Sequence, residues 1–422
     1  MSTGSGRAAT PPGRHGPDVV YRAMRREKGP MSEAVPSRQF TRETANIGTG
    51  PNEWSADLPA EWLQFEDEGG FFDLLAAADY SLCVTREYEH FVLALDGKDG
   101  KALQSAFPLP HPSGFAFDPA TRELVVSSTR TPNILVWLTP YEPSAAGAEI
   151  APDDLDLDQP GTLFLPRQAR YLPGTLYIHD LVRMGGDLYA TITGHNFLAK
   201  VDLDRGFERV WWPKALDGLG AAAFNQNYFQ LNSVAPNDTP DVSFYTGFSD
   251  LVTGAKPWKE GYGPKGKGVV FAGETREPIL RGLTCPHSAK LDGGRLWICD
   301  SGFGTIGYVE NYENLDAGTA RYVPIATLPG FTRGLAFAGD LIFVGLSKVI
   351  AKYEPYAPGI DSASSRCGVV AIDRHTGKTV ASLTWPEGYQ LYDVQILPGV
   401  KNPRFPVARR EDGINPLLRF LW

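Results

Sequence analysis

The feature that most constrains the fold is a sequence unit that recurs along the chain. The segment His179-Asp-Leu-Val-Arg-Met-Gly-Gly-Asp-Leu-Tyr aligns without a gap with His287-Ser-Ala-Lys-Leu-Asp-Gly-Gly-Arg-Leu-Trp. A third copy begins at Arg333, with one residue deleted in its turn. Short apolar or alternating runs separated by Gly-Gly, Gly-Asp or Asp-Gly turns are typical of β-hairpins. Weaker copies of the unit begin at Ser113, Asn232 and Tyr392.

The spacing of these copies predicts the architecture. The six starts lie 46 to 66 residues apart, which suits four-stranded propeller blades with inserted loops. The last start has too little chain after it for a whole blade, whereas segment 70–106 supplies strands without a start. We therefore expect an inner strand near 391–397 to join outer strands from 80–106, which closes the ring and removes exposed sheet edges. The prediction is an all-β, six-bladed β-propeller; seven blades are the alternative, because segment 118–175 has room for another.

Composition divides the rest of the chain. We expect a disordered tail at 1–50, a lead-in segment at 51–69, the propeller at 70–402 and a C-terminal extension at 403–422. Translation from Met31 is an alternative to translation from Met1. The acidic stretch PDDLDLDQP, within 118–175, is interpreted as an exposed insertion.

Charge and cysteine usage limit the function classes. With 40 basic and 49 acidic residues the net charge is −9, so nucleic acid is not an expected partner. The sequence contains no run of about 18 apolar residues, so we expect no membrane span. The first residues lack the apolar core of a signal peptide. The four cysteines show no CxxC spacing and fit a cytoplasmic protein. No glycine-rich phosphate loop is present in a strand–loop–helix context, so no nucleotide cofactor is expected.

Several longer strings resemble a known family. GLTCPHSAKLDGGRLWICDSGFG, LPGFTRGLAFAGDLIFVGLSK, CGVVAIDRHTGK, YDVQILPGVKNP and YLPGTLYIHDL are similar to an uncharacterised bacterial domain-of-unknown-function family with propeller-like sequence. The resemblance covers roughly 80–405 and supports the fold, but it implies no reaction. Two departures stand out: Gln230 occupies a position where the family usually has His, and the family's His is missing from RQARYLPGTLYIHD. An activity that depends on those histidines would be altered here.

The repeat also predicts which side chains meet in the central channel. Inner strands line a propeller channel, and strand side chains alternate with period two. The first residues of the six copies should therefore form one ring, and the residues two positions earlier a second ring on the same face. The first ring contains Ser113, His179, Asn232, His287, Arg333 and Tyr392; the second contains His111, Tyr177, Gln230, Cys285, Phe331 and Gln390.

These rings suggest a small-molecule site. His179, His287 and His111 are predicted to hold a divalent transition metal (Fe, Cu, Zn or Mn), as sets of imidazoles do in catalytic centres. Arg333, Tyr392 and Tyr177 are predicted catalytic residues, and the predicted substrate-binding residues are Asn232, Arg333, Gln230 and Ser113. Cys285 is an alternative metal ligand or nucleophile. Asp180 and Asp393 should point the opposite way, into the blades, and hold backbone amides.

Two functions fit this pattern. The first is an enzyme, with metal assistance, that oxidises, hydrolyses, eliminates or isomerises a small polar or anionic substrate; the composition is compatible with specialised metabolism. The second is a non-catalytic propeller that presents its loops to a protein partner, with the polar rings as solvated filler.

Overall fold

The computed structural model describes residues 59–130, 133–141, 161–253, 263–316 and 318–405. The chain divides into a unit of residues 1–37 and a unit of residues 38–422, and every described residue belongs to the second. The predicted tail, the acidic stretch and most of the C-terminal extension lie outside the described residues, so the predicted domain limits stay predictions.

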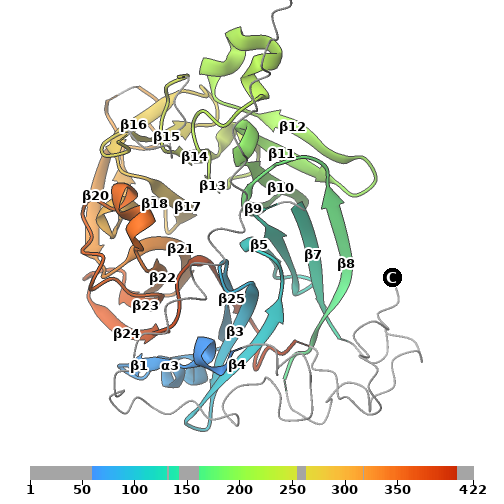
Figure 1. Ribbon diagram of the computed structural model, residues 1–422, viewed down its shortest axis with the longest axis vertical. Coiled ribbons are helices and arrows are strands. Elements are labelled where there is room, and N and C mark those ends of the chain that lie inside the picture. Colours follow the sequence, from blue (N-terminus) through green and yellow to red (C-terminus); the bar gives the residue numbers. More distant parts are fainter. Residues whose placement is uncertain (1–58, 131–132, 142–160, 254–262, 317, 406–422) are drawn as a thin grey trace, which may run out of the picture. The chain divides into compact units, whose positions relative to one another are not determined.

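Six antiparallel sheets form a ring in which the innermost strands of neighbouring sheets contact each other in cyclic order (Figure 1). Each sheet is a blade and is named here after its innermost strand. The β25 blade consists of β25 (Leu391–Pro398), β2 (Tyr80–Arg86), β3 (Phe91–Lys98) and β4 (Lys101–Pro108). The β5 blade consists of β5 (Pro112–Asp118), β6 (Glu123–Ser128), β7 (Asn133–Pro140) and β8 (Phe164–Leu172). The β9 blade consists of β9 (Ile178–Met184), β10 (Asp187–Ile192), β11 (Phe197–Asp202) and β12 (Gly206–Trp211).

The other three blades follow in chain order. The β13 blade consists of β13 (Ser233–Ala235), β14 (Phe244–Gly247), β15 (Gly268–Ala272) and β16 (Pro278–Leu283). The β17 blade consists of β17 (Pro286–Asp292), β18 (Arg295–Asp300), β19 (Thr305–Glu310) and β20 (Arg321–Thr327). The β21 blade has five strands: β21 (Phe331–Ala338), β22 (Leu341–Ser347), β23 (Gly368–Asp373), β24 (Thr379–Thr384) and β1 (Glu66–Glu68). The helices are α3 (Phe71–Ala77) and the 3-10 turns η1 (Ala60–Leu63), η4 (Thr193–His195), η5 (Lys214–Phe224), η6 (Pro240–Val242), η7 (Ser301–Phe303) and η8 (Ala351–Tyr356).

The predicted six-bladed propeller is confirmed. Each predicted start lies in an innermost strand or immediately before one. In the described part of segment 118–175 the strands β6, β7 and β8 all belong to the β5 blade, so the seven-bladed alternative is wrong. None of the helices in the described ranges has the length and apolar character needed to cross a bilayer.

The predicted closure of the ring is confirmed as well. Strand β25 pairs antiparallel with β2, from Tyr80 opposite Pro398 to Arg86 opposite Leu391. Just beyond β25, the Nζ of Lys401 donates to the carbonyl oxygens of Leu75 at 2.9 Å and Ala78 at 3.1 Å, and to Asp96 Oδ1 at 2.8 Å. These bonds fasten the late segment to the end of α3 and to β3.

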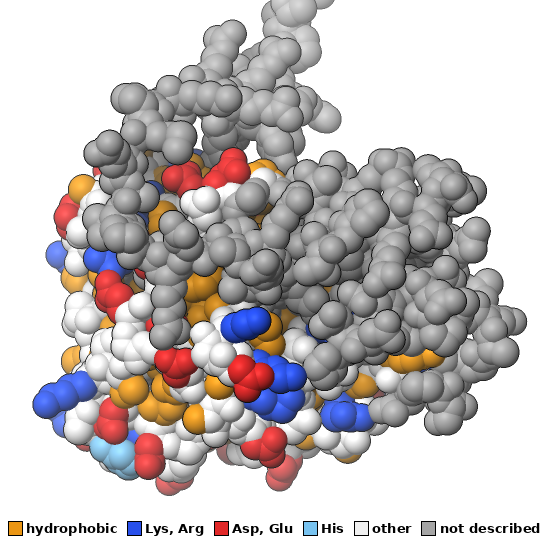
Figure 2. Space-filling model, turned by 90° about the horizontal axis from the view of Figure 1, so that it is seen from below, with side chains coloured by type: hydrophobic (Ala, Val, Ile, Leu, Met, Phe, Trp, Pro, Cys, Tyr) orange, Lys and Arg blue, Asp and Glu red, His pale blue; other side chains and the backbone are white. Residues whose placement is uncertain are grey.

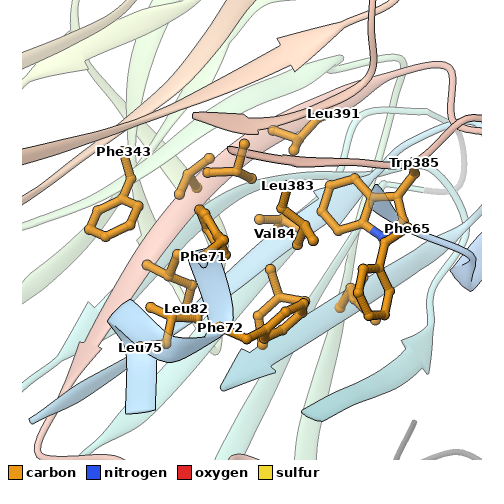
Figure 3. Close-up of a cluster of buried hydrophobic side chains, with 14 of the residues drawn as sticks. Phe65, Phe71, Phe72, Leu75, Leu82, Val84, Phe343, Leu383, Trp385 and Leu391 are labelled. Carbon is orange, nitrogen blue, oxygen red and sulfur yellow. The ribbon is translucent and has the colours of Figure 1, made fainter. Parts of the chain in front are cut away.

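The hydrophobic core is divided among the interfaces between blades. One cluster of buried apolar side chains fills each of the six interfaces. The cluster between the β21 and β25 blades is covered by α3, which buries Phe71, Phe72 and Leu75 against them (Figure 3). Apolar burial of this kind stabilises the fold by roughly 25 cal/mol per Å², so neighbouring blades depend on each other. Where described side chains are visible in Figure 2, Lys and Arg are interspersed with Asp and Glu.

Candidate functional site

A pocket lies where the innermost strands begin. Five of the six first-ring residues line it together: His179, Asn232, His287, Arg333 and Tyr392. It is also lined by Asp180, Ser233, Ser288, Lys290 and Asp393. The free space between these side chains holds about one water-sized molecule. A functional group of a ligand, rather than a whole ligand, therefore fits between them.

A repeated β-bulge explains why consecutive residues line this pocket. In the β9 blade, His179 and Asp180 together lie opposite Thr191. In the β25 blade, Tyr392 and Asp393 together lie opposite Thr85. A bulge of two residues against one breaks the alternation of side chains between faces. The prediction that Asp180 and Asp393 point away from the channel is therefore wrong, because it assumed a regular strand.

The second bulge residue joins each blade to the next. Asp180 Oδ2 accepts a hydrogen bond from the Val234 amide at 3.0 Å, and Asp393 Oδ2 accepts one from the Phe115 amide at 3.0 Å. The prediction that these carboxylates hold backbone amides is correct. Serines do the same elsewhere in the ring: Ser233 Oγ accepts from the Ala289 amide at 3.1 Å and Ser288 Oγ from the Gly334 amide at 2.7 Å.

Lys290 was missed by the sequence analysis. Its side chain lines the pocket near Asp180 and Asp393, which come from two other blades. Burial raises the pKa of Asp393 to about 6 and raises that of Asp180, and Lys290 opposes both changes. Burial alone would lower the pKa of Lys290, but the two carboxylates hold it above its usual value. The three groups therefore form a cluster of two carboxylates and one ammonium that stabilise each other's charged forms in part.

Arg333 has no carboxylate within ion-pairing distance among the described residues, although its charge favours the ionised forms of Glu87 and Asp180. It is 7% exposed, and its guanidinium carbon lies 3.3 Å from the centre of the Tyr392 ring. The guanidinium makes no hydrogen bond or ion pair with another residue that the structure describes. Buried cations are normally paired, because an uncompensated charge is costly to remove from water. The position of Arg333 therefore favours an anion in the pocket.

His287 is held in one orientation. Its Nδ1 lies 2.9 Å from the Cys285 carbonyl oxygen and 3.0 Å from Ser301 Oγ. Its ring is flanked edge-on by the rings of Phe248 and Phe331, with centroids at 5.3 and 5.4 Å. Burial, with smaller contributions from Arg333 and His179, lowers the pKa of His287 well below its usual value. His287 is therefore a neutral imidazole at neutral pH.

His179 is neutral for the same reason but is less constrained. Burial and the positive charge of Arg333 lower its pKa well below the usual value. Its Nδ1 is buried without a hydrogen-bond partner among the described residues, and so is the Tyr392 hydroxyl. The two rings meet edge-on, with centroids 5.3 Å apart.

The side chains of two predicted substrate-binding residues make hydrogen bonds within the fold. Ser113 is fully buried, and its hydroxyl donates to the Ile178 carbonyl at 2.8 Å. Asn232 Oδ1 accepts from Thr246 Oγ1 at 2.9 Å, and its Nδ2 donates to the Pro286 carbonyl at 2.9 Å. Ser113 lies outside the set that lines the pocket. A role for either residue in binding substrate stays a prediction.

The predicted second ring does not join the pocket lining. Four of its members have left-handed backbone conformations: His111, Tyr177, Gln230 and Cys285. The strand alternation on which the prediction relied therefore does not hold there. Tyr177 is 41% exposed, whereas Cys285 is fully buried. Gln230 Oε1 accepts from Asn227 Nδ2 at 2.7 Å. The φ angles of the four left-handed residues lie between 47° and 51°.

His111 belongs to a separate polar cluster that the sequence analysis missed. Its Nδ1 lies 3.7 Å from Oε1 of the buried Glu87, which also accepts from Arg130 Nε at 3.3 Å. Its ring meets the His90 ring edge-on, with centroids 4.2 Å apart. Although burial opposes it, the nearby His111, Arg130 and Arg333 lower the pKa of Glu87.

The donor set does not fit the predicted three-histidine metal centre. Throughout the described ranges, no three His, Cys, Asp or Glu side chains are grouped so that they could hold a metal ion. His179 and His287 line the pocket, but His111 stands beside Glu87 and His90. No chemical step is therefore derived through a metal.

The chain is similar to one described protein family and to several solved structures. A family model described as "Domain of unknown function (DUF4915)" matches residues 69–405. No curated protein matches the chain. A protein of unknown function from Bacteroides caccae is 12% identical, with 76% of this chain and 99% of that chain covered and a TM-score of 0.48. The calcium-binding protein regucalcin from Agrobacterium tumefaciens is 11% identical (64% and 73% covered, TM-score 0.40), and a gluconolactonase from Xanthomonas campestris is 14% identical (66% and 77% covered, TM-score 0.39).

Proposed function

This chain belongs to the DUF4915 family, whose description assigns no activity, and we propose that it is a small-molecule enzyme that binds an anionic group of its substrate in the channel pocket. The observation that carries the proposal is Arg333, a residue only 7% exposed whose guanidinium lies over the Tyr392 ring and makes no hydrogen bond or ion pair with a described residue. A carboxylate or phosphate would pair with its forked donors. A cytoplasmic setting is part of the proposal, supported by the four free cysteines.

The neutral imidazole of His287 supplies the chemistry. Proton transfer by a positioned imidazole is the commonest form of general acid–base catalysis. In the proposed reaction, His287 Nε2 takes a proton from a substrate group next to the anion. The bond from Nδ1 to the Cys285 carbonyl stabilises the resulting imidazolium. Binding of the anion offsets the charge of Arg333, which raises the pKa of His287 and strengthens it as a base when the substrate is present.

Anion binding tests the proposal directly. We expect acetate, phosphate or sulfate to raise the melting temperature of the wild-type protein, because a ligand that binds only the folded state stabilises it. Arg333→Gln should abolish this effect. Arg321→Gln is the matched control, since Arg321 is 70% exposed and pairs with Glu310 on the surface.

Two outcomes contradict the proposal: no shift with any of the three anions, or an equal shift in Arg333→Gln. Either would favour the non-catalytic binding protein. A screen of metabolite mixtures by mass spectrometry then tests turnover, with His287→Gln as the inactive comparison. The separate metal prediction is tested by elemental analysis of the purified protein and of a His179→Ala, His287→Ala double variant.

A further inference from the structure

The pocket offers hydrogen-bonding capacity of two opposite kinds. The Arg333 guanidinium can only donate, and its donors are unused among the described residues. His287 is 4% exposed, and its Nε2 makes no hydrogen bond with any residue that the structure describes. Which role Nε2 plays depends on where the imidazole proton lies.

The surroundings of Nδ1 decide this. The Cys285 carbonyl oxygen can only accept, so Nδ1 at 2.9 Å from it must carry the proton. The Ser301 hydroxyl donates its own hydrogen to the Thr332 carbonyl at 2.6 Å, so its oxygen also accepts from Nδ1. In a neutral imidazole the other nitrogen is then an acceptor. Nε2 therefore presents a lone pair to the pocket.

Several other polar side chains of the pocket already have hydrogen-bond partners within the fold. Asn232 uses its oxygen and its amide hydrogens on Thr246, Gln230 and Pro286. The hydroxyls of Ser233 and Ser288 and the carboxylates of Asp180 and Asp393 accept bonds from backbone amides of neighbouring blades. Arg333 and His287 Nε2 therefore offer a ligand a strong donor and a defined acceptor, and His179, Tyr392 and Lys290 line the same pocket.

We propose that the bound anion carries an O–H group that donates to His287 Nε2 while its negative oxygens pair with Arg333, and that Ser301 is a positioning residue for this contact. This inference rests on the proposed function, because it specifies the anion of that same site. Two kinds of ligand have this chemistry: a hydroxycarboxylate and a hydrogen phosphate. An anion without the O–H covers Nε2 and leaves it unpaired in the complex, which costs binding free energy.

Matched pairs of anions test the inference at pH 7. Glycolate differs from acetate by one hydroxyl, and phosphate carries a proton that sulfate lacks. Calorimetric or thermal-shift titration of the wild-type protein should show the O–H member binding about 5- to 100-fold more tightly within at least one pair. A preference confined to glycolate identifies a hydroxycarboxylate, and a preference confined to phosphate identifies a phosphate group.

Variants test whether the preference for the anion with an O–H group depends on His287. His287→Gln offers a donor as well as an acceptor, so it should bind both members of a pair with similar affinity. Ser301→Ala is the milder change and should reduce the preference without abolishing anion binding. His375→Gln is the control, because His375 is 68% exposed in a surface turn.

The outcomes separate the two proposals. Equal affinity of the wild-type protein for both members of both pairs overturns the O–H inference and leaves the anion site standing. A preference that survives unchanged in both His287→Gln and Ser301→Ala also overturns it. Absence of binding for all four anions overturns the proposed function itself.

Discussion

The guanidinium carbon of Arg333 lies 3.3 Å from the centre of the Tyr392 ring, which places the cation over an aromatic face. The two residues come from neighbouring blades and occupy equivalent positions of the repeat. The contact fixes the direction of the arginine's donors without neutralising its charge. A cation held in this way stays available to a ligand.

The stack should therefore be needed for anion affinity. Tyr392→Leu should weaken anion binding by roughly 2- to 30-fold, which corresponds to about 0.5–2 kcal/mol of cation–π energy. Tyr392→Phe keeps the ring and removes a hydroxyl that is buried without a partner among the described residues. It should leave affinity unchanged and raise the free energy of unfolding by up to about 1 kcal/mol. Titration and urea denaturation measure the two quantities; weaker binding in Tyr392→Phe would contradict this view of the stack.

Gly334 should be required for packing at the bulge. Its φ is +83°, and an added Cβ would lie 2.7 Å from the Val394 nitrogen. Gly334→Ala should lower the free energy of unfolding by at least about 3 kcal/mol, because left-handed strain and a clash with backbone add together. Gly339→Ala is the matched control: φ is +56° with nothing within 4 Å, so only about 1 kcal/mol is expected. Similar losses in both variants would show that the clash is absent.

Stability should depend on pH through the buried histidines. Burial lowers the pKa of His90 to about 4 and lowers those of His179 and His287 well below 6.5. Below pH 6.5 these histidines are protonated in the unfolded chain but stay neutral in the folded chain, so the free energy of unfolding falls as the pH falls. The contribution of His90 to this loss ends near pH 4, where its imidazole is protonated in the folded chain as well. Each histidine accounts for at most about 1.4 kcal/mol per pH unit.

Buried carboxylates act in the opposite sense. Burial raises the pKa values of Asp393 and Asp300 to about 6, so the folded chain takes up these protons first and gains stability as pH falls from about 6 towards 3.8. The two effects therefore oppose each other in the wild type below about pH 6. Urea denaturation at pH 7.5, 6.5 and 5.5 should show the stability of His179→Gln rising relative to the wild type as pH falls. A constant difference would mean that His179 is protonated in the fold; His375→Gln is the exposed control.

The cysteines should be unreactive in the native protein. All four are free and buried, and burial raises the pKa of each thiol, that of Cys367 to about 12. A thiol reagent at pH 7 should label none of them until the protein is unfolded, when four should react. Rapid labelling that is lost in Cys285→Ser would restore Cys285 as a nucleophile.

The repeat was sufficient to predict the architecture. Six copies with similar turns required six equivalent strands, and the incomplete last copy required a partner from the first sheet. The side chains that face the channel at the first ring position followed from the same alignment. Five of those six line one pocket.

The sequence analysis did not detect the irregularities of the inner strands. A period of two cannot place Asp180 or Asp393, because a bulge changes the face of every residue beyond it. A signal was present: glycine follows the ring position at Gly114 and Gly334, and glycine inside a strand often marks a bulge. Lys290 and Glu87 carried no such signal, since their roles depend on charges contributed by other blades.

The pairing of β25 with β2 also orders events during synthesis. Strands β2, β3 and β4 leave the ribosome first, yet their sheet lacks its innermost member until β25 has been made, some three hundred residues later. Until then β2 presents an unpaired edge, a known starting point for aggregation. Joining the native ends and opening the chain between two middle blades would leave β1 as the one described strand between β25 and β2 in the sequence. In such a circular permutant, β25 and β2 would be synthesised close together in time, so the edge of β2 would stay unpaired for a shorter period.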